Sequence, residues 1–167
     1  MNNFINLKFE RLIMHHPALD RYDISILNLL QQNSQIPRIE LAEQIGLSSS
    51  QCFRRIKRLE EEGVIDHYVA VVNKKKVGID VSAVIMVQYR KSEVDARKRT
   101  IELIQNHPLI HECHSITGED DFMLHVYCKT MEEFNHLIND TLQASFISGL
   151  HTYMLLSSIK SKQALQV

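Results

Sequence analysis

Two short helices joined by a glycine turn are predicted between Pro37 and Gly63, where the sequence is PRIELAEQIGLSSSQCFRRIKRLEEEG. Proline suits the first turn of a helix, and Gly46 suits a helix C-terminus, where the backbone often takes a positive φ. Ser48 and Gln51 have the spacing of a capping box, which predicts a second helix that runs to Glu62. This arrangement is typical of a helix-turn-helix, whose second helix enters the major groove of DNA.

The predicted second helix has two different faces. At about 100° per residue, Cys52, Ile56 and Leu59 fall on one side, where they pack against the preceding helices. The other side offers hydroxyl, amide and cationic groups, which bind base edges and phosphates. The predicted DNA-binding residues are Ser48, Ser49, Ser50, Gln51, Arg54, Arg55, Lys57 and Arg58. Among them, we expect the residues from Ser49 to Arg54 to contact bases, and the last three cations to hold phosphate.

The alternative for this stretch is an ordinary amphipathic surface helix, because a run of charges is usually a solvated face. The glycine turn, the polar helix entry and the cation cluster occur together here, and their combination favours DNA binding.

The positive charge of this chain is local. Its 167 residues include 19 Lys and Arg and 20 Asp and Glu, which gives a formal net charge of −1. Because Glu60–Glu62 directly follow the basic run, we expect each copy to bind DNA with modest, salt-sensitive affinity. A dimer or larger assembly, which links several sites, would then be needed for useful binding.

The composition also indicates the cellular compartment in which the protein is expected. No apolar run is long enough to span a membrane, and the N-terminus lacks the pattern of a secretory signal. The three cysteines (Cys52, Cys113, Cys128) are odd in number and have no CxxC spacing. A reducing cytoplasm is therefore the expected location, with no membrane partner.

Five segments are predicted along the chain. Residues 1–18 form an N-terminal extension, of which 1–13 precede an alternative start at Met14. Residues 19–72 form a winged helix-turn-helix domain, in which Asp20 caps a helix that ends at Gln32 and residues 64–65 and 68–72 form the strands of a wing. Residues 73–80 are a linker, whose three lysines are either solvated or in contact with phosphate. The last two segments are a second domain at 81–160 and a C-terminal tail at 161–167.

The second domain alternates strands and helices. We expect strands at 81–89, 110–117, 122–129 and 150–159, and helices at 95–106 and 131–142. The order β-α-β-β-α-β is that of a ferredoxin-like domain, so the whole chain is α+β. Two helices cover only one face of such a sheet. Val84, Met86, Met154 and Leu156 place apolar groups on the other face, which predicts that a partner covers it.

The chain resembles the Lrp/AsnC family of transcriptional regulators. The resemblance rests on LDRYDISILNLLQQNSQIPRIELAEQIGLSSSQCFRRIKRLEEEGVIDHYVAVVN in the first half, and on IHECHSITGEDDFMLHVY and TYMLLSSIK in the second. It implies a winged helix-turn-helix followed by a regulation-of-amino-acid-metabolism (RAM) domain. It also implies a homodimer that assembles further, to an octamer or another disc, and an amino-acid effector bound between dimers.

By this resemblance, the effector site lies at the turn Gly118–Asp121. Asp121 would receive the α-amino group of the effector, and backbone amides beside Gly118 would face its carboxylate. On the last strand, Tyr153, Met154 and Leu155 match positions that respond to the effector in relatives. Asp120 departs from the pattern, since an aromatic or aliphatic residue commonly stands there. The added negative charge favours a basic or metal-bridged effector, and the alternative is a plain acidic hairpin without a ligand.

Other functions have weaker support in the sequence. His111–His114 with His125 and Cys128 have metal-binding side chains, but alternation along a strand divides the first group between two faces. No nucleophile elbow, phosphate loop or catalytic triad is recognisable, so we predict neither an enzyme nor a cofactor. Two functions remain open, an effector-responsive transcriptional regulator and an architectural DNA-binding protein that ignores ligands.

Overall fold

Residues 18–160 and residue 165 are described in the computed structural model. They divide into two units, the first comprising the residues up to Ala70 together with residue 165, and the second spanning Val71–Lys160. The predictions for residues 1–17 and for all of the tail except residue 165 lie outside the described residues. Among the helices described, none is long and apolar enough to cross a bilayer.

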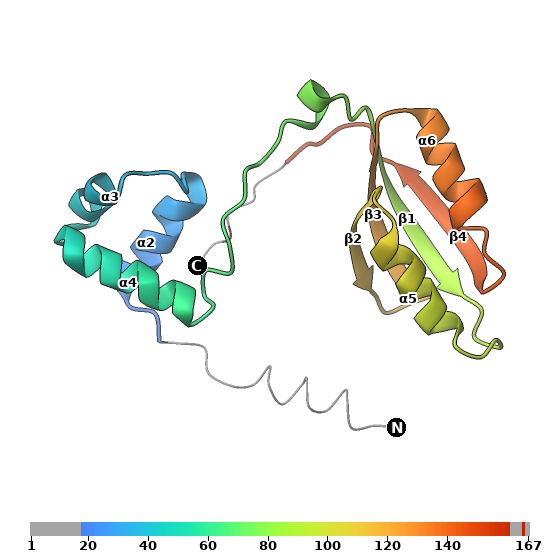
Figure 1. Ribbon diagram of the computed structural model, residues 1–167, viewed down its shortest axis with the longest axis horizontal. Helices are drawn as coiled ribbons and strands as arrows, with labels where there is room; N and C mark the ends of the chain where they lie inside the picture. Colours follow the sequence, from blue (N-terminus) through green and yellow to red (C-terminus); the bar gives the residue numbers. More distant parts are fainter. Residues whose placement is uncertain (1–17, 161–164, 166–167) are drawn as a thin grey trace. The chain divides into compact units, whose positions relative to one another are not determined.

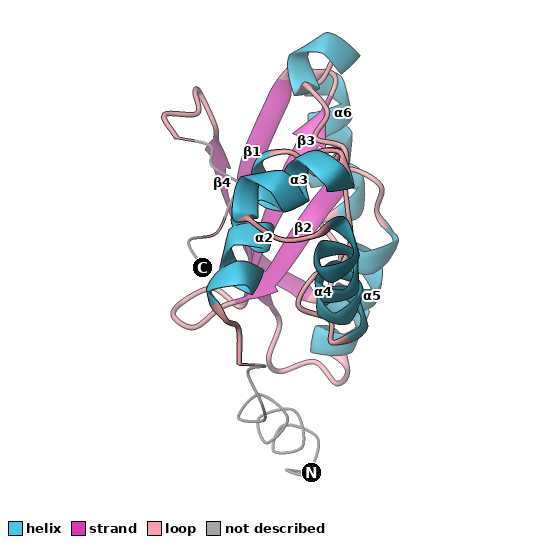
Figure 2. Cartoon of the chain, turned by 90° about the vertical axis from the view of Figure 1, so that its left-hand side faces the viewer, coloured by secondary structure: helices cyan, strands magenta, loops and turns pink. Residues whose placement is uncertain are grey.

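The first unit contains three helices, α2 (Arg21–Gln32), α3 (Arg38–Ile45) and α4 (Ser49–Glu61), which short loops connect (Figure 2). The expected local signals set their ends. The side chain of Asp20 caps α2, Pro37 precedes α3, and Gly46 ends α3 with a φ of 72°. The buried hydrophobic residues of this unit are Ile26, Leu27, Leu30, Ile36, Leu41, Ala42, Cys52, Ile56 and Leu59.

The predicted wing strands are absent from this chain's described residues 64–72, which are extended or bent without strand pairing. Val69 and Val71 are 63% and 65% exposed. A strand requires a second strand beside it to satisfy its backbone groups, and none is found among the residues of this unit that the structure describes. β-branched composition alone therefore gave the wrong secondary structure for this segment.

A short 3₁₀ helix, η1 (Lys74–Val77), occupies the predicted linker. The ammonium group of Lys74 lies 3.5 Å from the centre of the Tyr127 ring, a cation–π contact with the sheet of the second unit. Gly78 ends η1 with a φ of 77°.

The second unit is a four-stranded antiparallel sheet with two helices (Figure 1). Its strands are β1 (Val81–Tyr89), β2 (Ile110–Ser115), β3 (Phe122–Cys128) and β4 (Ile147–Met154). Helix α5 (Ala96–Asn106) connects β1 to β2, and α6 (Met131–His136) follows β3. The strand order β2-β3-β1-β4 is that of a ferredoxin-like fold, as predicted.

The central strands place alternate residues in the core. Ala83, Ile85 and Val87 of β1 are fully buried, and so are Leu124 and Val126 of β3. They pack with apolar residues of α5 and α6 in one cluster. Val84 and Met86 lie on the opposite face, where they are only partly buried.

Two elements differ most from the prediction, whereas the other helices and strands of the second unit differ by at most two residues at either end. The last strand begins at Ile147 and ends at Met154. It pairs with β1 from Tyr89 back to Ala83, and few residues of β1 precede Ala83 to continue the pairing. The predicted helix 131–142 changes after His136 into a π-helical turn, η2 (Leu137–Thr141). The amide of Leu142 donates to the carbonyl of Leu137 at 3.0 Å, which is the i to i+5 hydrogen bond of that geometry.

Candidate nucleic-acid interface and effector turn

The entry of α4 is fixed by the predicted capping box. The backbone N–H of Gln51 donates to the Ser48 hydroxyl at 3.3 Å, and the backbone N–H of Ser48 donates to the Gln51 side chain at 3.1 Å. The Ser48 hydroxyl also donates to that side-chain oxygen at 2.9 Å. Both residues are exposed, but the hydroxyl of Ser48 and the amide oxygen of Gln51 already serve the cap.

The outer face of α4 carries four further exposed residues among those predicted to bind DNA. They are Ser49, Ser50, Arg54 and Lys57. Lys57 forms an ion pair with Glu61 at 3.5 Å, in which both side chains are more than 60% exposed. Such exposed pairs contribute little, so a phosphate can replace the glutamate. Arg54 has no carboxylate partner among the described residues.

Arg55 and Arg58 are held by a buried carboxylate of α2. Asp23 is fully buried, and its two oxygens accept from Arg55 Nη1 at 2.8 Å and from Arg58 Nη2 at 2.6 Å. Asp20 accepts a second bond from Arg55 at 2.8 Å. Burial opposes the charge of Arg55, but its hydrogen bonds to Asp23 and Asp20 outweigh that effect and raise its pKa. The pKa of Asp20 is lowered, first by the N–H of Asp23 and then by Arg55.

This link between α2 and α4 was not predicted. The available signal was the position of Asp23, which shares helical spacing with the buried residues Ile26, Leu27 and Leu30. A carboxylate on an apolar helix face is rarely buried without a cation, so its position called for an arginine partner.

The predicted effector turn follows β2. Gly118 has a φ of 127°, which favours glycine. The backbone N–H of Asp121 donates to the carbonyl of Val87 at 3.0 Å, and its carboxylate accepts from the backbone N–H of Tyr89 at 3.1 Å. Lys91 places its ammonium 3.4 Å from the same carboxylate. The turn is thus fastened to the end of β1.

Asp120 also has partners within the chain. Its carboxylate accepts from the side-chain amide of Gln88 at 3.1 Å and lies 3.3 Å from Nδ1 of His151. Gln88, His151 and Lys91 were not singled out from the sequence, because the turn and its neighbours on β1 and β4 are far apart along the chain. Only the strand register brings Gln88 and His151 together around Asp120.

Within one chain, Tyr153, Met154 and Leu155 lie away from the turn. Tyr153 and Met154 pair with Val84 and Ala83, and the N–H of Leu155 donates to the Ser82 carbonyl. The turn instead bonds to Val87 and Tyr89. Val87 lies four residues along the strand from Ala83, which is roughly 13 Å. All three side chains are exposed, at 59%, 40% and 47%.

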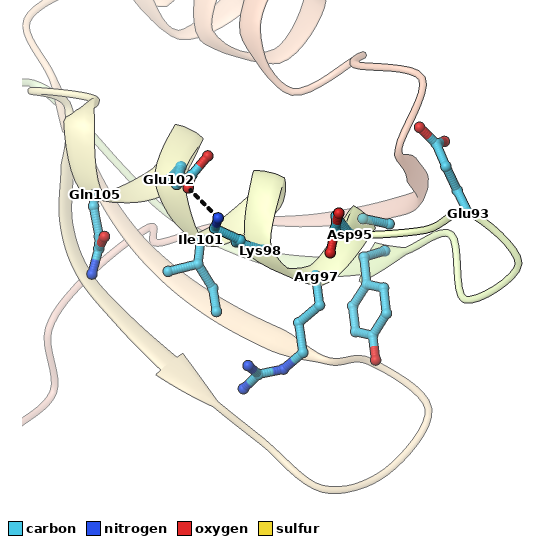
Figure 3. A pocket seen from close by; sticks show the side chains of 9 residues that line it. Glu93, Asp95, Arg97, Lys98, Ile101, Glu102 and Gln105 are labelled. Atoms are coloured by element: carbon cyan, nitrogen blue, oxygen red, sulfur yellow. Dashed lines mark ion pairs between the residues drawn. The ribbon is translucent and has the colours of Figure 1, made fainter. Parts of the chain in front are cut away.

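A shallow pocket of about 520 Å³ lies along α5 (Figure 3). The side chains of Arg97 and Ile101 extend from the helix on the same side (Figure 3). Several of its charges are already paired, since Glu93 bonds to Arg99 and Lys98 lies 3.8 Å from Glu102. The guanidinium of Arg97 lies 5.7 Å from the centre of the Phe122 ring, next to the turn.

In the described part of the chain, no three His, Cys, Asp or Glu side chains gather as a metal-binding group. A bulge in β2 near Ile110 sets the local register, which pairs Glu112 with His125 and His114 with Met123. His114 lies 3.4 Å from Glu112 and packs edge-on against His125.

Two family models match the two units. A winged helix-turn-helix DNA-binding model matches residues 19–66, and the Lrp/AsnC ligand-binding domain matches residues 82–165. The chain belongs to the Lrp/AsnC family. Members of this family are DNA-binding transcriptional regulators with a ligand-binding domain and are not enzymes, so this chain is a regulator of that type.

Full-length relatives support this membership. The chain is 36% identical over 143 residues to the transcriptional regulator AzlB of Bacillus subtilis, a match that covers 85% of this chain and 91% of that protein. It is 33% identical over 144 residues to the leucine-responsive regulatory protein of Haemophilus influenzae, covering 86% and 87%.

Solved Lrp/AsnC structures have the same fold. The L-methionine complex of a transcriptional regulator from Neisseria meningitidis matches with a TM-score of 0.83 and 34% identity, covering 88% of this chain and 96% of that one. LrpC of Bacillus subtilis matches with a TM-score of 0.77 and 29% identity, covering 87% and 100%.

Proposed function

We propose that this regulator binds specific DNA sequences through the outer face of α4 and that an amino acid or related metabolite, bound between dimers, modulates the binding. The observation that carries the DNA part is the exposed row Ser49, Ser50, Arg54 and Lys57 on a helix whose entry is fixed by its own cap. Hydroxyl and guanidinium groups near the N-terminal end of a recognition helix are suited to contact base edges.

The proposed effector site is the turn Gly118–Asp121, joined by side chains from another copy. Asp121 is 17% exposed and already holds one ammonium group, that of Lys91, so its carboxylate suits the α-amino group of an amino acid. The methionine complex of the Neisseria relative supports an amino acid as the class of effector. Because Tyr153, Met154 and Leu155 lie away from the turn of their own chain, their contribution requires an assembly in which a second copy supplies them.

We further propose a homodimer that assembles into an octamer or larger particle in the cytoplasm. The exposed apolar side chains at the end of β4 and beyond, among them Leu156 at 96%, support an interface between copies. Domain limits of 19–72 and 81–160, with a linker at 73–80, belong to the same proposal.

The test is a thermal-shift screen of the purified protein against the twenty amino acids, repeated with Asp121→Asn. A ligand that binds the folded protein must raise its melting temperature. We expect one hit or a few chemically related hits, each lost in the variant, and a change of the DNA footprint in the presence of the hit. A hit that survives the substitution would move the site away from the turn.

The second candidate is an architectural DNA-binding protein without an effector. The observation that favours it is that Asp120 and Asp121 already have partners within the chain. It predicts that no amino acid shifts the melting temperature and that no footprint changes.

A further inference from the structure

We infer that Asp23 is a positioning residue for DNA binding, which withholds Arg55 and Arg58 from DNA phosphate and leaves Arg54 and Lys57 as the cations of α4 that contact DNA. The inference rests on the proposed contact between α4 and DNA. It assigns different roles to the cations of α4, which are neighbours in the sequence and whose roles cannot be told apart from residue type alone.

The geometry of Asp23 supports this division. Its side chain is only 1% exposed, and three donors surround its two oxygens: Arg55, Arg58 and the backbone N–H of Asp20 at 3.1 Å. A buried carboxylate without cations is costly. If either arginine moved from Asp23 to a DNA phosphate, part of the negative charge of Asp23 would therefore remain uncompensated. A solvent-exposed contact between the arginine and a DNA phosphate would contribute less free energy than its bond to the buried carboxylate of Asp23.

Arg55 and Arg58 each have further neighbours besides Asp23 that hold their side chains in place. Arg55 also bonds to Asp20 and lies 5.3 Å from the centre of the Tyr22 ring. Arg58 has Glu62 at 3.9 Å, and its side chain is 41% exposed. By contrast, Lys57 has one highly exposed partner, and Arg54 has none among the described residues.

The consequence concerns specificity. Each phosphate contact adds affinity for any DNA sequence and steepens the dependence of binding on salt. By holding two of the four cations, Asp23 reduces the sequence-independent part of the affinity. The contacts of Ser49, Ser50 and Arg54 with bases then form a larger share of the total, which raises the ratio of specific to non-specific binding.

The experiment measures binding of the full-length protein to a mixed-sequence duplex as a function of salt, for Arg58→Gln, Arg55→Gln and the matched control Lys57→Gln. Losing a phosphate contact lowers the slope of log K against log salt by about 0.9, which is about 3.5-fold over a fourfold change in salt. We expect this loss for Lys57→Gln, and a smaller one, under a third of it, for the two arginine variants. Equal losses for Lys57→Gln and Arg58→Gln would overturn the inference.

Asp23→Asn provides the opposite test, because it keeps the shape of the side chain and removes its charge. The freed arginines should tighten binding to the mixed-sequence duplex and steepen the salt slope, and adding Arg58→Gln to this variant should remove part of the gain. An Asp23→Asn protein that folds, as judged by circular dichroism, and has an unchanged or shallower slope would overturn the inference. If this variant does not fold, the comparison of Arg58→Gln with Lys57→Gln decides alone. Unchanged slopes in all single variants would instead remove α4 from the DNA contact, and the proposed function with it.

Discussion

The ammonium group of Lys91 lies 3.4 Å from the carboxylate of Asp121, the group that we propose receives the α-amino group of an effector. The lysine side chain is 69% exposed, whereas that of Asp121 is 17% exposed. An exposed cation thus lies where the α-amino group of the proposed effector would bind, and breaking such an exposed ion pair costs little. The backbone N–H of Tyr89 holds the other side of the carboxylate in place.

Lys91→Gln should therefore strengthen effector binding. Removing a competing cation from an exposed pair gains up to about 1 kcal/mol, or roughly fivefold in Kd. The measurement is isothermal titration with the amino acid that gives the largest thermal shift. Lys98→Gln is the matched control, since Lys98 pairs with Glu102 on α5 instead of with the turn. Weaker binding by Lys91→Gln would mean that the lysine orients Asp121 for the ligand.

Gly46→Ala should destabilise the first unit through the backbone alone. Gly46 has a φ of 72°, and nothing lies within 4 Å of the position that a Cβ would occupy. The left-handed conformation costs a residue with a Cβ roughly 1–2 kcal/mol, and asparagine tolerates it better. Urea denaturation followed by circular dichroism should thus rank glycine, asparagine and alanine in decreasing stability. An alanine variant as stable as the parent would contradict the role of Gly46 in the turn.

The α4 cap gives a second stability prediction. Ser48→Ala removes the acceptor of the Gln51 backbone N–H and should cost about 1 kcal/mol of the free energy of unfolding. Ser49→Ala, one position later on the exposed face, should change it by less than about 0.5 kcal/mol. If both variants lose the same amount in urea denaturation, the cap is not what stabilises the start of α4.

A pH prediction concerns His136 on α6. Its Nδ1 lies 2.6 Å from the Asp140 carboxylate, and this hydrogen bond, followed by the charge attraction, raises the pKa of His136. A raised pKa in the folded state means that the pair stabilises the fold fully below the ordinary value of 6.5 and loses this contribution as pH rises through the higher, folded-state value. An NMR titration should find His136 above 6.5. Asp140→Asn should lower its pKa, and an unchanged titration in that variant would refute the pairing.

Much of the helix-turn-helix could be predicted because its signals are local. Asp20, Ser48 and Gly46 act on backbone groups within a few residues, so their effect depends little on the rest of the fold. The alternation of buried residues in β1 and β3 likewise follows from the pleat of a strand. The two strands predicted at residues 64–65 and 68–72 were wrong, because a strand depends on a distant partner. The exact ends of β4 depended on the length of β1 beside it.

The sequence by itself determined the order of the α-helices, the order of the strands in the second unit, the helix ends of the first unit, the ferredoxin-like topology and the row of exposed polar residues on α4. Tertiary structure alone decided which charges remain available. It placed Asp23 beneath two arginines of α4, and it enclosed Asp120 and Asp121 with Gln88, His151 and Lys91. The physical reason is that capping and periodicity act over a few residues, whereas the pairing of a charge depends on which distant side chain the fold brings within about 3 Å of it.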